Sequence, residues 1–420
     1  MHTSITNHNN HNTPKTISPN DSYKDEMYID KRYKDESYKE RELIKTLKEL
    51  VSIPSVFGEE HRIAEYIRER LEDFAEVRIE KVDGFGGNVV AECINDESYP
   101  TLILNGHIDT VPVMEGWKTD PYKPIVHDGK LIGLGACDMK AGVAINMALF
   151  KEFASRKAWN ANIIFVGACD EEGNSKGSYE YLQKFKKRKF DKERTLALLT
   201  EPTNEKLMLG CRGRYVVEIK VKGVSAHGAR PYLGVNAIED AAKVIEAISK
   251  VPIKRHPRLG KGSICVLKIE GGGDSLSVPD LCKIRVDRHV VPGETKSSVM
   301  KDIVNAVLNK VSKSNLRSKI EFNWMERPTP FLEPYELSKT RNVVNKFLIA
   351  AKEFGLDVRF TYGESVGDYN LFGRCMPTLV FGPSGGKWHS HDEFVNLESV
   401  FRCKRVLSRF IEILPELKRF

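Results

Sequence analysis

The chain is predicted to adopt an α/β fold in which a mostly parallel sheet carries helices on both faces. From about residue 41, short buried apolar runs alternate with amphipathic helical patterns, an order typical of parallel sheets. A segment of alternating apolar residues in β-α-β-β-α-β order interrupts it, which favours an inserted, ferredoxin-like α+β domain. We therefore expect an extension at 1–40, a large domain in two parts, 41–212 and 328–420, and an inserted domain at 213–327.

The expected elements follow from the spacing of apolar residues along the chain. A period near 3.6 predicts helices, and short apolar or alternating runs predict strands. Helices are expected at 43–51, 59–74, 142–153, 178–189, 237–250, 296–313, 340–354 and 397–417. Strands are expected at 77–82, 88–91, 101–106, 162–168, 195–200, 216–221, 264–269, 284–286 and 378–381.

Composition excludes several classes of function. The 420 residues are 41% hydrophobic and 29% charged, as in a globular protein, and a net charge of +7 is too small to indicate nucleic acid. No apolar run approaches the roughly 18 residues of a membrane helix, and the polar N-terminus argues against a secretory signal. Residues 1–40 contain almost no aliphatic side chains, so we expect this extension to be disordered despite its histidines.

The eight cysteines are scattered along the chain without a CxxC pair. Several lie in apolar runs, where a free thiol behaves as a small hydrophobic group. Neither a disulfide framework nor a thiolate zinc site is indicated, which favours a reducing cytoplasm.

Ionisable residues follow several of the apolar strands directly. One strand ends in His107-Ile108-Asp109, another in Asp170-Glu171-Glu172, and a third in Glu201. Three consecutive carboxylates after a buried strand have no simple structural explanation. Because ligands bind at the carboxyl ends of strands in open α/β sheets, we expect these side chains to meet at one edge.

Strand geometry indicates how metal binding and proton transfer could be divided among these side chains. Side chains alternate across a strand, so Glu171 and Glu172 should point in different directions, one holding a metal and the other handling protons. His107 and Asp109 should share a face, where the carboxylate could orient a metal-bound imidazole; an ordinary core histidine is the alternative. Asp138 precedes a helix, and spacing alone does not decide between a helix cap and a carboxylate that bridges cations.

Taken together, these stretches resemble the M20 family of zinc metallopeptidases and deacylases from about residue 41 to the C-terminus. Six motifs in the order of that family carry the resemblance. They are Gly-His107-Ile-Asp109-Thr-Val-Pro, Gly-x-Gly-x-x-Asp138-Met-Lys-Ala-Gly, Asp-Glu171-Glu172-Gly, Glu201-Pro-Thr, Ser-Ala-His227-Gly-Ala-Arg-Pro and His389-x-x-x-Glu393.

The resemblance implies a site with two Zn²⁺ ions per subunit, for which Co²⁺ could substitute. His107 and Glu172 would hold one ion, Glu201 and His389 the other, and Asp138 would bridge them. In the same family pattern Asp109 orients His107, and Glu171 is the general base that takes a proton from water and passes it to the leaving amine. Asp170 receives no role from the family; we expect it to support the loop.

The inserted domain would be a lid that often pairs subunits, which implies a homodimer. His227 matches a lid histidine that stabilises the oxyanion from across the dimer. Arg212, Arg230 and Arg288 could neutralise a substrate carboxylate. The chain departs from the family where Leu276-Ser277-Val278-Pro279 replaces an Asn-x-x-Pro turn, and where Arg288 is shifted in its strand, so substrate specificity stays open.

The expected function is a di-zinc amidohydrolase of amino-acid metabolism that cleaves an N-acyl amino acid, as a deacetylase or desuccinylase does. One alternative is a carboxypeptidase or dipeptidase that uses the same site on a short peptide. Another is an inactive relative that acts as a binding protein; the presence of all five expected ligands and of Glu171 weighs against it. We expect neither nucleic acid nor a membrane as partner.

Overall fold

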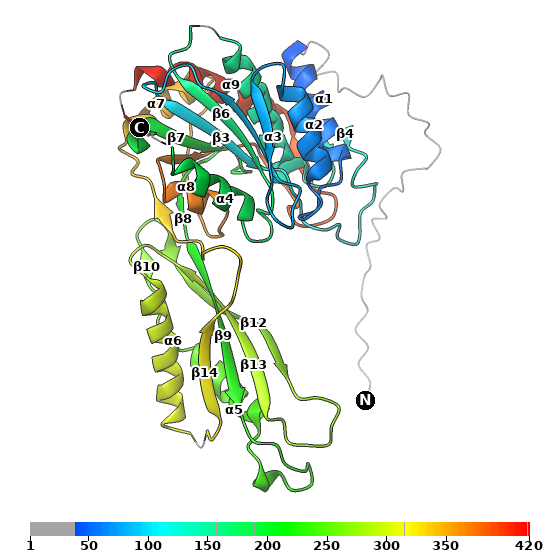
Figure 1. Cartoon of the computed structure of the whole chain (residues 1–420), viewed down its shortest axis with the longest axis vertical. Coiled ribbons are helices and arrows are strands. Elements are labelled where there is room, and N and C mark those ends of the chain that lie inside the picture. The colour runs from blue at the N-terminus through cyan, green and yellow to red at the C-terminus, as the bar shows by residue number, and fades with distance from the viewer. Residues whose placement is uncertain (1–37, 157, 189, 315, 418) are drawn as a thin grey trace, which may run out of the picture.

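The computed structural model describes residues 38–156, 158–188, 190–314, 316–417 and 419–420 (Figure 1). The expected extension lies outside the described residues except for its last turn, because helix α1 (Tyr38–Ser52) begins within it. Figure 1 shows a large unit of sheet and helices, from which the inserted domain projects.

The large unit is built on a nine-stranded sheet whose centre is parallel. Strands β6, β3, β7 and β17 lie side by side and run in the same direction, while antiparallel strands extend the sheet at both ends. The expected mostly parallel sheet is thus confirmed for its centre. The strands are β1 (Glu76–Glu80), β2 (Asn88–Cys93), β6 (Asn162–Ala168), β3 (Thr101–His107), β7 (Thr195–Leu199), β17 (Thr378–Val380), β8 (Leu207–Cys211) and β15 (Tyr335–Glu336), with β16 (Phe360–Gly363) beside β8.

Helices cover both faces of this sheet, as its apolar strands require. Along β6, Ile163 and Phe165 belong to one hydrophobic cluster, whereas Ile164 and Val166 belong to another on the opposite face. Such strands must be buried on both sides. One face is covered by α1, α2 (His61–Leu71), α3 (Ala141–Ala154), α7 (Asn342–Glu353) and α9 (Leu397–Glu412), the other by α4 (Lys176–Phe185) and α8 (Asp368–Gly373).

The inserted domain has the predicted β-α-β-β-α-β order. Its strands form an antiparallel sheet in the order β12-β13-β9-β14, with one face against the two helices and a core of its own. Strand β12 is an edge with mostly exposed side chains. The elements are β9 (Gly213–Lys222), α5 (Ala237–Ile248), β12 (Ser263–Gly271), β13 (Leu281–Val290), α6 (Lys296–Val311) and β14 (Lys319–Trp324).

A small sheet joins distant parts of the chain beside the large one. Strand β19 (Phe394–Asn396) pairs with β5 (Lys130–Ile132), and β18 (Gly385–Gly386) and β4 (Ile125–His127) flank this pair. The loop that carries His389 is therefore fixed next to the segment that leads to Asp138. Spacing of apolar residues did not predict these short strands.

The largest differences at the C-terminal ends of helices are at α4 and α9, which end four and five residues before the predicted positions. α4 ends at Phe185, so the basic residues at 186–188 lie beyond it. α9 ends at Glu412, shortly before Pro415, because proline cannot donate the backbone hydrogen bond that a helix interior needs. In the described part of the chain, no helix is long and apolar enough to cross a membrane. All eight cysteines are free thiols.

Candidate metal centre

The four central strands end at the same edge of the sheet, which brings the candidate residues together. His107 is the last residue of β3, the Asp170-Glu171-Glu172 triplet follows β6, and Glu201 follows β7. Because β6, β3 and β7 are neighbours and parallel, their carboxyl ends meet. The expected collection of ionisable residues at one edge is confirmed.

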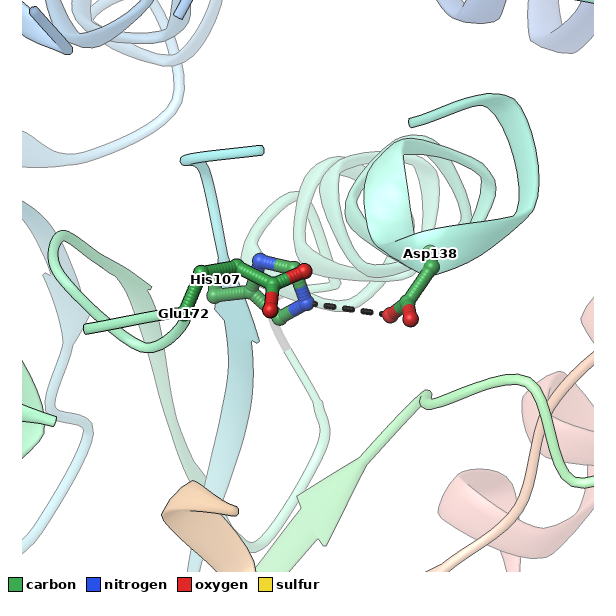
Figure 2. Close-up of side chains that lie close together, drawn as sticks. All are labelled: His107, Asp138 and Glu172. Carbon is green, nitrogen blue, oxygen red and sulfur yellow. Dashed lines mark hydrogen bonds and ion pairs between the residues drawn. The ribbon is translucent and has the colours of Figure 1, made fainter. Parts of the chain in front are cut away.

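The imidazole of His107 is held in one orientation by the backbone. Its Nδ1 donates to the carbonyl oxygen of Asp109 at 3.0 Å, which directs Nε2 toward the other candidate ligands. Nε2 lies 3.2 Å from Asp138 Oδ1 and 3.9 Å from Glu201 Oε2. Figure 2 shows His107, Asp138 and Glu172 facing one another; one ligand atom from each lies within 4.8 Å of the others.

His389 approaches the same carboxylates from the opposite end of the chain. Its Nε2 lies 3.0 Å from Glu172 Oε1 and 3.5 Å from Asp138 Oδ2. Asp138 therefore offers one carboxylate oxygen to each histidine. The contacts differ from the expected pairing, because His389 contacts Glu172 and His107 is the histidine near Glu201.

Asp138 does not cap the helix that follows it. It lies in a distorted turn at Ala136–Lys140, with a non-helical φ of −110° and ψ of 93°, and α3 begins only at Ala141. Its carboxylate points toward His107 (Figure 2) and also lies within 3.5 Å of His389 Nε2, instead of contacting the backbone N–H groups of the helix. The capping alternative is thereby excluded.

The triplet lies in a turn, so the strand argument for dividing its roles was wrong. β6 ends at Ala168, and Asp170 has a positive φ of 60°. Asp109 is buried, and its carboxylate accepts the N–H of Glu171 at 3.2 Å and of Glu172 at 3.0 Å. Its Oδ1 is 3.7 Å from His107 Nδ1, so Asp109 orients His107 mainly through its backbone oxygen and fixes the triplet through its side chain.

Asp170 supports this turn, as expected. Its carboxylate accepts the backbone N–H of Asn174 at 3.3 Å and of Lys176 at 3.1 Å. A Cβ atom at Gly173 would lie 2.1 Å from Asp170 Oδ1, so the close approach requires glycine there. The turn that presents Glu171 and Glu172 is thus closed by the side chain that precedes them.

Burial among like charges shifts the pKa values of this cluster. Burial, reinforced by Asp368, Glu201 and Glu172, raises the pKa of Glu171 well above its usual range. Burial likewise raises the pKa of Glu201 to about 8.

The pKa values of the two histidines and of Asp138 shift in the directions that ion pairing predicts. Burial by itself would lower the pKa of His107. The nearby carboxylates of Asp138, Glu201 and Glu171 outweigh this effect and raise the pKa well above its usual range. Contacts with Asp138 and Glu172 raise the pKa of His389 to about 10. Although burial acts in the other direction, both histidines lower the pKa of Asp138.

This donor set fits a divalent cation. Within the described ranges, the ion pairs of Asp138, Glu172 and Glu201 are formed with His107 and His389, and no Lys or Arg side chain lies within ion-pair distance of them. The carboxylates outnumber the histidines, and uncompensated buried negative charge is costly. Imidazole nitrogen and carboxylate oxygen are the donors that catalytic zinc takes.

Three arginines expected to contact substrate are placed differently from one another. Arg288 is 1% exposed and is bonded to Glu294, to the carbonyl oxygen of Ser263 and to that of His289, so its guanidinium is committed to the interior of the inserted domain. Arg212 is also buried and bonds to Leu259 O and to Glu364. Arg230 is exposed.

His227 lies far from the metal centre of its own chain. It is exposed and follows the distal end of β9, a strand of ten residues that starts beside the large sheet (Figure 1). At about 3.3 Å per residue, this strand spans about 30 Å. The structure therefore does not bring His227 together with the other candidate residues.

Two buried carboxylates near the site were missed or left without a role. Asp368 is 1% exposed, accepts a hydrogen bond from Ser178 Oγ at 2.6 Å, and its Oδ1 has no protein partner among the described residues. Glu393 is the last residue of a sequence motif that assigns it no role. A glycine before an acidic residue at a helix start, as in Gly367-Asp368, is the sequence signal from which Asp368 could have been found. A Cβ atom at Gly367 would lie 2.7 Å from Glu171 Oε1.

Comparison with known proteins shows the family to which this chain belongs. Residues 103–413 match the pattern of "Peptidase family M20/M25/M40". The chain is 27% identical over 376 residues to a succinyl-diaminopimelate desuccinylase of Wolinella succinogenes, covering 87% of this chain and 98% of the relative. It is 26% identical over 349 residues to an acetylornithine deacetylase of Vibrio atlanticus, covering 80% and 86%.

Solved structures agree on the fold. A tripeptidase from Staphylococcus aureus has a TM-score of 0.74 at 22% identity, covering 90% of this chain and 99% of the other. A dinuclear metal-binding M20 peptidase of Bacillus subtilis has a TM-score of 0.68 at 16% identity, covering 90% and 98%. The match of the family pattern extends over most of the chain. The protein therefore belongs to peptidase family M20/M25/M40 and is a hydrolase that acts on amide bonds.

Proposed function

We propose that the protein removes the acyl group of an N-acyl amino acid, as a deacetylase or desuccinylase, with two metal ions at the edge of the sheet. The observation that carries this proposal is the position of Asp138, whose Oδ1 lies 3.2 Å from His107 and whose Oδ2 lies 3.5 Å from His389. A carboxylate that offers one oxygen to each of two histidines could bridge a pair of metal ions, as in hydrolytic sites with two metals. The curated relatives favour N-acyl amino acids as the substrate class.

The contacts support a revised assignment of ligands. We assign His389 and Glu172 to one ion and His107 and Glu201 to the other, with Asp138 shared, because the shorter contacts follow this pairing. Zn²⁺ suits these donors, and Co²⁺ could replace it. When bound, the pair of ions would lower the pKa of a water molecule and polarise the amide carbonyl.

Glu171 is the proposed general base. Its backbone is fixed by Asp109, and its carboxylate forms none of the described ion pairs of the cluster. In this role Glu171 accepts a proton from water and then delivers it to the leaving amine. Glu171 thus has the proton-handling role, while Glu172 contacts His389.

His227 and the inserted domain support a homodimer. His227 lies beyond the reach of its own site, so it could stabilise the oxyanion only if a second copy of the chain supplies it. Edge strand β12 exposes Leu267 at 51% and Ile269 at 49%, together with the unpaired backbone of an edge. Such an edge favours pairing with another strand. Arg230, exposed near His227, is the arginine that remains best placed to meet a substrate carboxylate there.

A substrate screen tests this proposal directly. Purified protein with bound metal is offered N-acetylated and N-succinylated amino acids, dipeptides and tripeptides, and release of the free amine is measured. Hydrolysis of acylated amino acids is expected, with peptides much poorer. Hydrolysis confined to peptides would replace the deacylase with a peptidase, and no turnover of any amide would contradict both.

A further inference from the structure

Glu393 forms a set of contacts that the proposed chemistry does not use. The side chain is buried, 1% exposed, and its two oxygens accept three backbone N–H groups from a single turn. Oε2 accepts from Gly135, and Oε1 accepts from Cys137 and from Asp138, each at 2.9 Å. The last donor is the backbone of the residue that lies between the two histidines.

The same segment of chain carries the other half of the site. His389 lies four residues before Glu393, and between them Asp392 accepts the N–H of Lys118 at 3.0 Å. The backbone oxygen of Glu393 accepts from Gly133 at 3.0 Å, and β19 continues this contact by pairing with β5. Glu393 therefore connects the turn of Asp138 with the loop of His389, which are far apart in sequence.

These contacts require a side chain that accepts at both of its oxygens. Buried backbone N–H groups must be paired, and a carboxylate can accept all three of these while an amide cannot. A glutamine at this position has one acceptor oxygen, and its NH₂ group would face an N–H donor. The turn would then relax, and with it the direction of the Asp138 carboxylate.

We propose that Glu393 is a positioning residue that sets the Asp138 carboxylate between His107 and His389 and so determines how tightly the metal ions are held. This inference rests on the proposed function, because it takes these three residues as ligands. Partners behind the ligands of a metal typically change metal affinity about 10- to 100-fold when they are mutated. A purely structural role for Glu393 would affect folding and leave metal affinity unchanged.

Asp240 provides a matched control. It is also buried, 4% exposed, and its Oδ2 accepts two backbone N–H groups, of Arg317 at 3.1 Å and of Ser318 at 2.9 Å. It lies on α5 in the inserted domain, away from the metal centre. Its Oδ1 also forms an ion pair with Lys243 at 2.8 Å. Asp240→Asn therefore removes a buried carboxylate that accepts backbone N–H groups, together with this ion pair, from a place where no ligand depends on it.

The experiment compares full-length wild type, Glu393→Gln and Asp240→Asn. Metal-free proteins are titrated with Zn²⁺ against a chromophoric chelator, the visible absorption spectra of the Co²⁺ forms are recorded, and thermal unfolding of the metal-free proteins is measured. Glu393→Gln is expected to bind metal about 10- to 100-fold more weakly and to alter the Co²⁺ spectrum. Asp240→Asn is expected to lose thermal stability while its metal affinity and spectrum match wild type.

The outcomes separate this inference from the function on which it rests. Wild-type metal affinity and an unchanged Co²⁺ spectrum in Glu393→Gln would overturn the positioning role and leave the proposed function intact. A wild type that binds no metal would overturn both. If Glu393→Gln does not fold, Glu393→Asp, which retains the charge on a shorter side chain, is titrated in its place. It is expected to bind metal more weakly, and wild-type affinity in this variant would also overturn the inference.

Discussion

The edge of the large sheet and the distal tip of the inserted domain both carry candidate functional residues, but they are built in opposite ways. At the edge, His107 is 2% exposed and Asp109 is fully buried, and each is bonded in a defined orientation. At the tip, His227 is exposed and the neighbouring Leu276 is 88% exposed. The edge is organised within one chain, whereas the tip presents side chains that only another surface could bury.

The order at the edge comes from buried carboxylates that accept backbone N–H groups. Asp109 holds the turn of Glu171 and Glu172, Asp170 closes it, and Glu393 holds the turn of Asp138. Hydrogen bonds to charged groups contribute about 1.5–3 kcal/mol each, roughly twice the value for neutral groups. The ligand loops are thus fixed by side chains that need not touch the metal.

Removing metal should abolish activity at the edge, which is the largest effect we expect. The buried carboxylates of the cluster would lose the cation that compensates them, and ions bound only to the folded state also stabilise it. Treatment with a chelator is expected to eliminate turnover and lower the Tm, and added Zn²⁺ or Co²⁺ to restore both. Turnover that is indifferent to chelation would contradict a metal mechanism.

Glu171→Gln should separate chemistry from metal binding at the same edge. The amide retains the shape of the side chain but cannot accept the proton, so kcat is expected to fall about 10²- to 10⁴-fold. Metal content, measured by elemental analysis, should stay at the wild-type value because Glu171 is not an assigned ligand. A variant with near-normal kcat would remove Glu171 from its role.

His227→Ala tests whether the tip of the inserted domain acts at the sheet edge that carries the metal centre. Loss of one oxyanion donor typically reduces kcat about 10²- to 10³-fold, and metal content should not change. The tip is expected to act on a second copy, so mixing His227→Ala with Glu171→Gln and allowing subunits to exchange should restore part of the activity. Each mixed dimer would contain one intact site. Activity that stays at the level of the separate variants would exclude this arrangement.

Arg288→Met should affect stability more than chemistry. Breaking the buried ion pair with Glu294 leaves an uncompensated charge, which typically costs about 3–5 kcal/mol. Denaturant unfolding is expected to show this loss with metal content unchanged.

Glu321→Gln provides a control at the surface of the same domain. Its ion pairs with Lys222 and Lys319 lie on the surface, where solvent screens them, so no measurable change in unfolding is expected. If Arg288→Met were as stable as this control, with a raised KM, Arg288 would regain its place as a residue that contacts substrate.

The order of apolar runs was sufficient to predict both parts of the fold, because burial on two faces leaves continuous apolar strands and burial on one face leaves alternating ones. It was also sufficient to expect His107, the triplet and Glu201 at one edge. Strands β8, β14 and β16 were missed, and so were the short strands β5, β18 and β19, in which two or three residues carry no measurable period. The direction of Glu171 relative to Glu172 was argued from a strand that ends at Ala168, two residues before the triplet begins.

Sequence by itself determined which residue types are available, in which order, and at the ends of which strands. Only the tertiary structure decided that His389 meets Glu172, that Asp138 lies between the two histidines, and that the carboxylate of Glu393 holds the backbone of Asp138. The physical reason is that a strand has a local periodicity that apolar residues reveal. A turn is held by long-range hydrogen bonds between segments, and these leave no period in the chain.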